Sequence, residues 1–136
     1  MLKTNLPTRN FVLPAFWGLV LLILSGFPGN NIHNISVLEF DHADKVAHFI
    51  MYFIFCFLLI YCFNKSYGKP TLLIFIYAFA ISTTYGILME LLQHYVFINR
   101  SGNIYDILAN SAGALTAVGA FRPLTKLFKK INPFKH

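Results

Sequence analysis

The stretch YGILMELLQHY places one acidic residue, Glu90, inside a long apolar segment of the chain. The surrounding residues are typical of a helix that crosses a membrane, where a carboxylate that faces lipid is strongly disfavoured. We therefore expect Glu90 to point into a helix bundle, where it either meets polar partners or is protonated. Its position in the last turns of the segment places it near the membrane interface and away from the bilayer centre.

Polar side chains on two other segments have spacings that would bring them to the same place. Residues three or four positions apart share one face of a helix. The candidate binding residues are Asp44, Lys45, His48 and Tyr52 on one segment, Glu90 and Gln93 on the next, Arg100 in the connection, and Asp106 and Asn110 on the last segment. Histidine and a desolvated carboxylate are suited to proton transfer, and lysine and arginine are suited to binding phosphate.

Two of these positions, and two residues near them, also allow a simpler role at the start of a helix. Asp41 and Asp44 could cap one helix, because an acid at a helix start accepts hydrogen bonds from free backbone amides and meets the helix dipole favourably. Asn103 and Asp106 could do the same for the last helix, since their spacing resembles a capping box. Capping does not exclude a second role for these residues.

The remaining polar residues have their own alternatives. Lys45 and Arg100 could be anchors among the lipid headgroups, as basic residues at membrane edges often are. Capping does not explain Glu90, Gln93 or His48, because they lie beyond the first turns of their helices. For Glu90 a functional site and a buried structural network both stay open, since a satisfied polar network can also specify how helices pack.

The composition indicates a membrane protein. The chain is 57% hydrophobic and only 12% charged, against roughly a quarter charged residues in soluble domains. Apolar stretches bounded by breakers predict spanning helices over residues 11–27, 41–63, 70–97 and 103–121, the third beginning at Pro70 and the last ending before Pro123. The first stretch could instead be a signal peptide, although no small-x-small cleavage site follows it. We predict an all-α polytopic protein, with a four-helix domain at residues 1–121 and a basic amphipathic tail at residues 122–136.

The basic residues predict the orientation of these helices, because they gather on the cytoplasmic side of a membrane. With four spans, nine of the eleven lysines and arginines fall at one end of the bundle. The other end has only Lys45 and Arg100, and it holds or adjoins all five acidic residues. We therefore expect both termini in the cytoplasm and the polar candidates at the outer face.

Small and hydroxylated residues predict how the last two helices pack. A small residue at every fourth position lets another backbone approach closely, and this pattern occurs at Ala109, Gly113 and Ala117. We therefore expect the last helix to be central to the bundle. The hydroxyl groups of Ser82, Thr83 and Thr84 are expected to bond back to their own helix.

The basic tail has a helical pattern of its own. Leu124, Leu127, Phe128 and Ile131 recur at helical spacing between the lysines. This pattern fits an interfacial amphipathic helix on anionic lipid. A short basic tail that merely fixes the topology fits equally well.

Four motifs together resemble a known family. The segments DKVAHFIMYFIF, GILMELLQ and DILANSAGAL, with the isolated Arg100 between the last two, look in order and spacing like the VanZ-like family of small bacterial membrane proteins. The match extends from about Asp44 to Gly119. The family pattern falls on Asp44, Lys45, His48, Tyr52, Gly86, Glu90, Gln93, Arg100, Asp106, Asn110 and Gly113, and all of these residue types are present. The resemblance implies a four-helix protein of the bacterial inner membrane, and its name-giving member is associated with low-level resistance to the glycopeptide teicoplanin.

Three functions fit these expectations. In the first, an outward-facing pocket binds the headgroup of a lipid-linked envelope precursor or alters access to it, with Lys45, His48 and Arg100 on phosphate and Glu90 and Asp106 orienting those cations. The second is an enzyme at the membrane surface that acts on a phosphate or acyl group. The third is a small interaction subunit of a larger envelope complex, whose polar network only rigidifies the bundle.

The motifs favour a binder or an accessory factor over an enzyme. The sequence contains no nucleophile elbow, zinc-ligand motif or Gly-rich phosphate loop. A metal site formed by His48, Glu90 and His94 is conceivable from residue type alone. We predict no metal, no cofactor and no nucleic-acid partner, and we expect the partner to be a membrane lipid, a lipid-linked precursor or other envelope membrane proteins.

Overall fold

The computed structural model describes residues 8–26, 43–69, 71–97 and 102–131. The regular elements in these ranges are η1 (Thr8–Phe11), a 3-10 turn, and the helices α1 (Val12–Gly26), α2 (Ala43–Tyr67), α3 (Leu72–Tyr95) and α4 (Ile104–Ile131). η1 together with α1, and each of the other three helices, is long and apolar enough to cross a membrane. The described chain is therefore all-helical with four candidate spans, as predicted.

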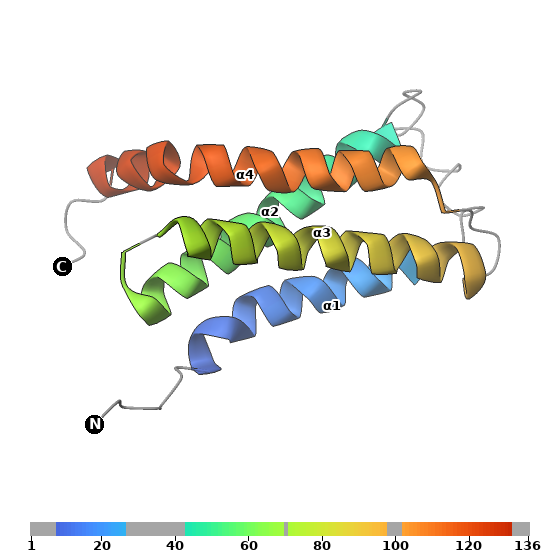
Figure 1. Ribbon diagram of the computed structural model, residues 1–136, viewed down its shortest axis with the longest axis horizontal. Helices are drawn as coiled ribbons and strands as arrows, with labels where there is room; N and C mark the ends of the chain where they lie inside the picture. Colours follow the sequence, from blue (N-terminus) through green and yellow to red (C-terminus); the bar gives the residue numbers. More distant parts are fainter. Residues whose placement is uncertain (1–7, 27–42, 70, 98–101, 132–136) are drawn as a thin grey trace.

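The helices alternate in direction along one bundle (Figure 1). The start of α1, the end of α2, the start of α3 and the end of α4 lie at the same end. Among the described residues this end, which we call the basic end, carries Arg9, Lys65, Lys69, Arg122, Lys126, Lys129 and Lys130. The opposite end, which we call the acidic end, carries Asp44, Lys45, Glu90 and Asp106. The predicted separation of charge is thus present in the described residues, and the side of the membrane on which each end lies stays a prediction.

The start of α3 differs from the prediction. The helix begins at Leu72 and not at Pro70, and Thr71 is its N-cap, with a side-chain oxygen that accepts a hydrogen bond from the backbone of Ile74 at 3.4 Å. Threonine can satisfy a free amide of the first turn in this way, which proline cannot do. Residue 70 lies outside the described residues.

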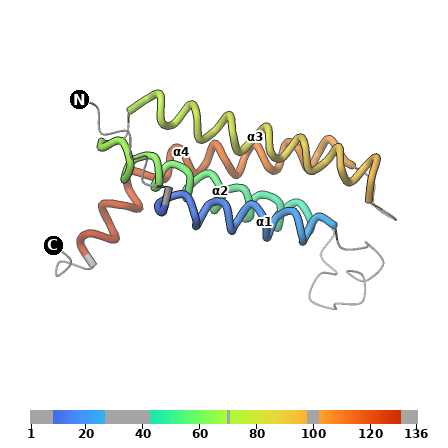
Figure 2. Tube along the Cα trace, turned by 90° about the horizontal axis from the view of Figure 1, so that it is seen from below, coloured from blue at the N-terminus to red at the C-terminus, as the bar shows by residue number. Residues whose placement is uncertain are grey.

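The predicted end of the last helix is wrong, because α4 continues through Pro123 to Ile131. A proline removes one backbone hydrogen bond and bends a helix, and Figure 2 shows α4 bent towards its end. In apolar surroundings a bend is favoured over an end, since a helix satisfies the remaining backbone groups internally. The hydroxyl of Thr125 donates to the carbonyls of Phe121 at 2.8 Å and Arg122 at 3.0 Å beside the bend.

The bent end of α4 keeps the amphipathic pattern of the sequence. Leu127 and Phe128 are exposed large hydrophobic residues, and Lys126, Lys129 and Lys130 are exposed among them. The segment is thus helical. Its placement on a lipid surface stays a prediction, as does the boundary between a membrane domain and a tail at residues 121 and 122.

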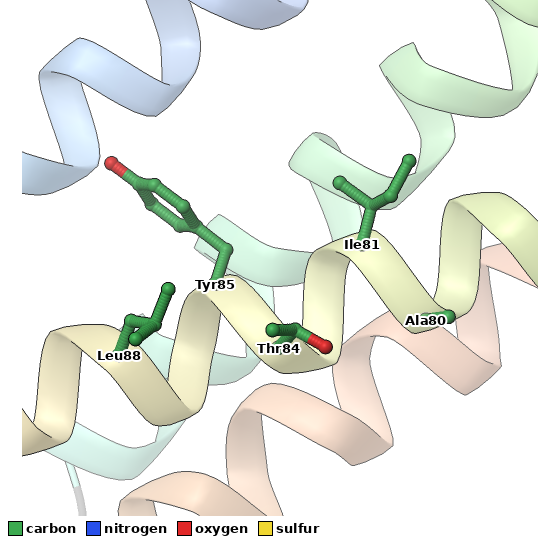
Figure 3. Close-up of a pocket in the computed structure, with 5 residues that line it drawn as sticks. All are labelled: Ala80, Ile81, Thr84, Tyr85 and Leu88. Atoms are coloured by element: carbon green, nitrogen blue, oxygen red, sulfur yellow. The ribbon is translucent and has the colours of Figure 1, made fainter.

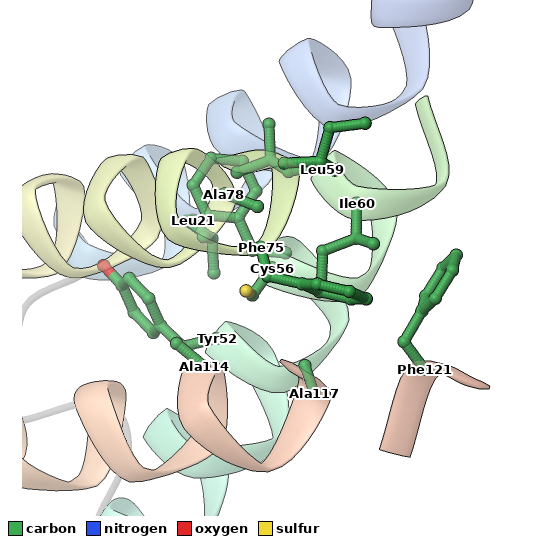
Figure 4. Packing of buried hydrophobic residues seen from close by; sticks show 12 residues of the cluster. Leu21, Tyr52, Cys56, Leu59, Ile60, Phe75, Ala78, Ala114, Ala117 and Phe121 are labelled. Atoms are coloured by element: carbon green, nitrogen blue, oxygen red, sulfur yellow. The ribbon is translucent and has the colours of Figure 1, made fainter. Parts of the chain in front are cut away.

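The apolar core lies between α1, α2, α3 and α4 (Figure 4). Its buried members are Leu21, Tyr52, Phe55, Cys56, Leu59, Ile60, Ile74, Phe75, Ala78, Ala114, Ala117 and Phe121. Cys56 and Cys62 are both buried and both free thiols. The core is made by aliphatic and aromatic packing, with the ring of Phe121 centred 5.1 Å from that of Phe57 and 6.1 Å from that of Phe75.

The central helix is α2, whereas the small-residue pattern predicted α4. α2 packs on α1, α3 and α4, and its contact with α4 is the most extensive in the bundle. Gly113 is buried where the two helices meet, and a Cβ atom built on it would collide with the backbone carbonyl of Phe49. Ala117 is fully buried on the same face, while Ala109 is half-buried. Glycine therefore sets how closely α4 approaches α2.

Candidate functional site

The acidic end of the bundle buries polar residues from three helices. His48 on α2, Glu90 and Gln93 on α3, and Asp106 and Asn110 on α4 are each at most 6% exposed. Burying such groups is costly unless they meet one another or a ligand. The predicted convergence of these helix faces is therefore present in the structure, and its contacts can be followed atom by atom.

His48 is the centre of this group. Its Nδ1 atom lies 3.0 Å from Oδ1 of Asn110 and 3.8 Å from Oε1 of Glu90. Its Nε2 atom lies 3.7 Å from Oδ1 of Asp44, one turn earlier on the same helix. The amide oxygen of Asn110 can only accept, so Nδ1 carries the proton of that hydrogen bond. One imidazole thus joins side chains from α2, α3 and α4.

Lys45 lies beside this group on the side of α4. Its Nζ atom is 3.8 Å from Oδ1 of Asp106, and its side chain is 36% exposed while that of Asp106 is 7% exposed. The carboxylate therefore sits inside the bundle and holds a lysine whose head reaches solvent. This is the orienting contact predicted for Asp106.

Glu90 has a structural role that the sequence reasoning missed. Its Oε2 atom accepts a hydrogen bond from the backbone of Asn103 at 3.1 Å, just before α4 begins. The side chain of Asn103 in turn accepts from the backbone of Tyr105 at 3.0 Å. The expectation that capping cannot explain Glu90 was wrong, because the carboxylate comes from the neighbouring helix to satisfy an amide at the start of α4. Its other oxygen, Oε1, is buried, faces His48 and accepts no hydrogen bond from the described residues.

Gln93 lies at a different contact. Its side-chain amide donates to the carbonyl of Ser25 at 3.4 Å and so joins α3 to the end of α1. Two further side chains hold α1 in the same way, since Trp17 donates to the carbonyl of Met51 at 3.0 Å and Tyr85 donates to the carbonyl of Gly18 at 2.6 Å. The structure thus gives Gln93 a connecting role, beside the group around His48.

Tyr52 and Gly86 pack beside Asn110 of the polar group. A Cβ atom built on Gly86 would lie 3.1 Å from both the ring of Tyr52 and the amide nitrogen of Asn110. A second close approach, which the sequence reasoning missed, occurs at Gly102, whose Cβ would lie 2.6 Å from the carbonyl of Glu90. In both places an absent side chain brings α4 against α3. The signal in the sequence for Gly102 was a glycine directly before the start of the last helix.

The hydroxyls of Ser82 and Thr83, in the middle of α3, do not bond back to their helix as predicted, while the prediction for Thr84 stays untested. The side-chain oxygens of Ser82 and Thr83 are buried and hydrogen-bond to no described residue, as is also true of the Tyr52 hydroxyl and the Asn110 amide nitrogen. The hydroxyls of Ser111 and Thr116 on α4 do bond back, at 2.9 Å and 2.8 Å. Buried polar groups in native proteins nearly always have partners. These side-chain atoms could therefore make hydrogen bonds beyond those that the helix packing provides.

Two cavities lie at the surface of α3. The first, of about 160 Å³, opens beside Glu90 between the end of α3 and the start of α4, and its other lining residues include His94, Tyr95 and Asn103. The second, of about 370 Å³, is lined by Ala80, Ile81, Thr84, Tyr85 and Leu88 of α3 (Figure 3). It does not touch the group around His48, so the smaller cavity is the one that belongs to the candidate site.

Arg100 lies outside the described residues, so its predicted place in the group stays a prediction. Among the described residues, His94 does not join the group. His94 is exposed and packs edge-on against Tyr95, with ring centroids 4.6 Å apart. The structure instead brings together Asp44, His48 and Asp106, whose donor atoms lie within 4.8 Å of one another.

Comparison with known proteins agrees with the resemblance stated from the motifs. Searches of the curated proteins and of the solved structures found no match. A family model described as VanZ/LLP1 matches residues 6–129, which covers η1, the four helices and the whole polar group. The match includes the motifs around Asp44, Glu90 and Asp106 and extends across the bend of α4. With four apolar spanning helices and this match over most of its length, the chain belongs to the VanZ/LLP1 family of membrane proteins.

Proposed function

We propose that the acidic end binds the polar headgroup of a membrane lipid, and that this lipid is a lipid-linked precursor of the cell envelope. The observation that carries the proposal is the burial of His48 among side chains from three helices, with one oxygen of Glu90 left without a hydrogen bond from the described residues. Well-packed apolar residues can replace a buried charged group without loss of stability, so helix packing alone does not explain this group. A ligand that meets these atoms explains why they are there.

The position of the group fits a headgroup. The small cavity beside Glu90 lies where α3 ends and α4 begins, at one end of two candidate spans. A lipid headgroup is expected at the end of a span. Lys45 reaches solvent from the same end and is oriented by Asp106, so its ammonium group is available to a phosphate. The lipid would therefore bring its phosphate to Lys45, with Arg100 of the adjoining connection as a second proposed contact.

Retention of lipid by the purified protein tests this proposal. Native mass spectrometry of protein extracted in a mild detergent would compare wild type with Lys45→Ala, Asp106→Asn and Arg100→Ala, after incubation with phosphatidylglycerol or a polyprenyl phosphate. We expect a retained lipid in wild type and at least a tenfold loss of retention in the variants. Lys65→Ala, at the basic end, is the matched control. Equal retention by wild type and Lys45→Ala would overturn the headgroup site.

The outward orientation of the acidic end belongs to the same proposal. Basic residues cluster at the opposite end of the bundle, and such residues favour the cytoplasmic side. Tyr95 is exposed at the acidic end and Lys69 at the basic end. In intact cells a membrane-impermeant maleimide should label Tyr95→Cys and not Lys69→Cys, because only the acidic end would face the outside. The native Cys56 and Cys62 are buried and should add no background labelling. The reverse pattern would place the site in the cytoplasm.

A change in glycopeptide susceptibility would be a consequence of this function. Teicoplanin-type antibiotics act on envelope precursors at the outer face, so a protein that binds such a precursor can alter access to it. Cells that produce wild type should be less susceptible than cells that produce Lys45→Ala at equal amounts. Equal susceptibility would separate lipid binding from resistance.

An interaction subunit is the second candidate, and one observation favours it. Glu90 accepts a hydrogen bond from the start of α4, and Gln93 donates one to the end of α1, so two site residues join helices. A network of this kind can serve the rigidity of the bundle alone. A protein partner that stays bound to both Lys45→Ala and Glu90→Gln, with no retained lipid, would favour this candidate.

A further inference from the structure

We infer that Asp44, His48 and Asp106 form a binding site for a divalent transition-metal ion. The donor atoms of the three side chains lie within 4.8 Å of one another. Imidazole nitrogen and carboxylate oxygen are ligands of Zn²⁺ and Mn²⁺, and three protein ligands with an open position are typical of zinc sites that act on substrates. In the tetrahedral case donor atoms are about 3.4 Å apart, from metal–ligand bonds of about 2.1 Å.

The state of His48 is the first argument. Its Nδ1–H donates to the buried Asn110 oxygen at 3.0 Å, which leaves the lone pair of a neutral imidazole on Nε2. That lone pair faces the Asp44 carboxylate at 3.7 Å, so two acceptors point at each other and a cation between them is favoured. A histidine ligand held by a hydrogen bond through its other nitrogen is the common arrangement at metal sites.

The charge balance is the second argument. Around His48 the described residues place three carboxylates, those of Asp44, Glu90 and Asp106, against the single ammonium of Lys45. Two of the carboxylates are buried, and buried charges need compensation. A divalent ion bound at His48 would add positive charge beside these carboxylates, next to the ammonium of Lys45.

Glu90 lies on the other side of the imidazole. Its Oε1 atom is buried, accepts no hydrogen bond from the described residues and lies 3.8 Å from Nδ1 of His48. Since the proposed ion lies on the Nε2 side, this carboxylate would help to hold the imidazole in place and would not be a ligand of the ion. Asp44 is 57% exposed, so its side chain can turn inward to close the site without disturbing the core.

The open position of the metal would receive an anionic oxygen. A phosphate is the ligand class that fits, because a divalent ion next to Lys45 would overcome the repulsion of the carboxylates. Only this last step rests on the proposed lipid function. The metal site itself stands on the three side chains and needs no lipid.

Metal titration of delipidated, chelator-treated protein tests the site directly. Wild type in detergent would be titrated separately with Zn²⁺ and Mn²⁺, with bound metal counted by elemental analysis and stability followed by melting temperature. We expect one ion per chain and a rise in melting temperature. Asp44→Asn should lower the affinity at least tenfold with an unchanged metal-free melting temperature, because the residue is exposed. His94→Ala is the matched control, since His94 lies outside the group.

Two further variants separate ligands from supporting residues. Asn110→Ala should weaken binding by 10- to 100-fold through loss of the His48 orientation, whereas His48→Ala should abolish it. Co²⁺ bound to wild type should give the absorption of a site with one nitrogen and several oxygen ligands, and His48→Ala should lose it. The inference would be overturned if wild type bound no stoichiometric metal, or if Asp44→Asn bound metal as well as wild type does. In that case a proton, and not a metal ion, would lie between Nε2 of His48 and Asp44.

The two proposals fail in different ways. Lipid retention measured with and without chelator distinguishes them. Lipid retained by chelated wild type and by Asp44→Asn would support the headgroup site and refute a metal bridge to phosphate. Metal bound by delipidated protein, together with no retention of added lipid by the metal-loaded protein, would support the metal site and refute the lipid function.

Discussion

The same helices α2, α3 and α4 build two halves of the bundle by different means. In the apolar half, towards the basic end, Ile60, Ala78 and Phe121 fill the space between helices with hydrocarbon and aromatic rings. In the acidic half, His48 and Asn110 fill it with polar groups that keep unused hydrogen-bonding capacity. A membrane bundle gains little from replacing lipid contacts by apolar contacts, so close packing must hold it together. Hydrogen bonds between helices in the acidic half also hold the bundle together, and the polar atoms that they leave without a partner mark the half where function is expected.

The closest helix contact lies beside the polar group and should be the most sensitive position. Gly113→Ala would drive a methyl group into the carbonyl of Phe49, and backbone atoms cannot move aside cheaply. We expect a loss of about 3 kcal/mol or more in the free energy of unfolding, at or above the upper range for overpacking. Titration with a denaturing detergent in mixed micelles would measure it.

Gly119→Ala is the control for that experiment. A Cβ atom on this exposed glycine has no neighbour within 4 Å. The replacement should stabilise α4 by about 0.5–1 kcal/mol, the ordinary advantage of alanine over glycine in a helix. Equal effects of the two substitutions would mean that α2 and α4 do not meet at Gly113.

The apolar half should respond to loss of a ring. Phe121→Ala removes a buried side chain that packs on Phe57 and Phe75. We expect a cost of about 3 kcal/mol, the lower part of the range for Phe→Ala in cores, and no effect on metal or lipid binding. Phe128→Ala, at an exposed position, is the control and should change the free energy of unfolding little. Loss of ligand binding in Phe121→Ala at full folding would couple the two halves.

Two substitutions of Glu90 separate the effect of its hydrogen bond on stability from the effect of its charge on binding. Glu90→Leu removes the acceptor for the Asn103 amide, and an unsatisfied buried amide costs about 1–3 kcal/mol. Glu90→Gln keeps an acceptor oxygen, so the free energy of unfolding should change by less than about 1 kcal/mol. Loss of lipid retention in the glutamine variant at normal stability would show that the charge serves binding. A glutamine variant as unstable as the leucine variant would instead make the charge part of the fold.

The smallest effect is expected in the middle of α3. Ser82 is fully buried and its hydroxyl bonds to no described residue, so Ser82→Ala should leave the free energy of unfolding within about 0.5 kcal/mol or raise it slightly. Ser111→Ala, which removes a bond to the carbonyl of Ile107, is the matched comparison. A cost above that of Ser111→Ala would reveal a polar partner for Ser82 and extend the polar half deeper into the bundle.

The sequence determined the features that depend on one helix at a time. Composition and the spacing of breakers predicted four spanning helices, and a period of three to four residues placed His48, Glu90 and Asn110 on inward faces. The asymmetry of lysines and arginines predicted that the described charges separate to two ends. These predictions succeed because helix periodicity and the cost of polar groups in lipid act locally.

The tertiary structure decided which of these faces meet and at what distance. Helix crossing and close approach at Gly113 and Gly102 bring Glu90 to the amide of Asn103, where the sequence suggested only a cap from within the same segment. The same geometry joins Asp44, His48 and Asp106 and leaves His94 outside. It also lets α4 continue past Pro123, because a bend in an apolar environment preserves the other backbone hydrogen bonds. Pairings between helices depend on register and crossing angle, and neither is contained in the period of a single segment.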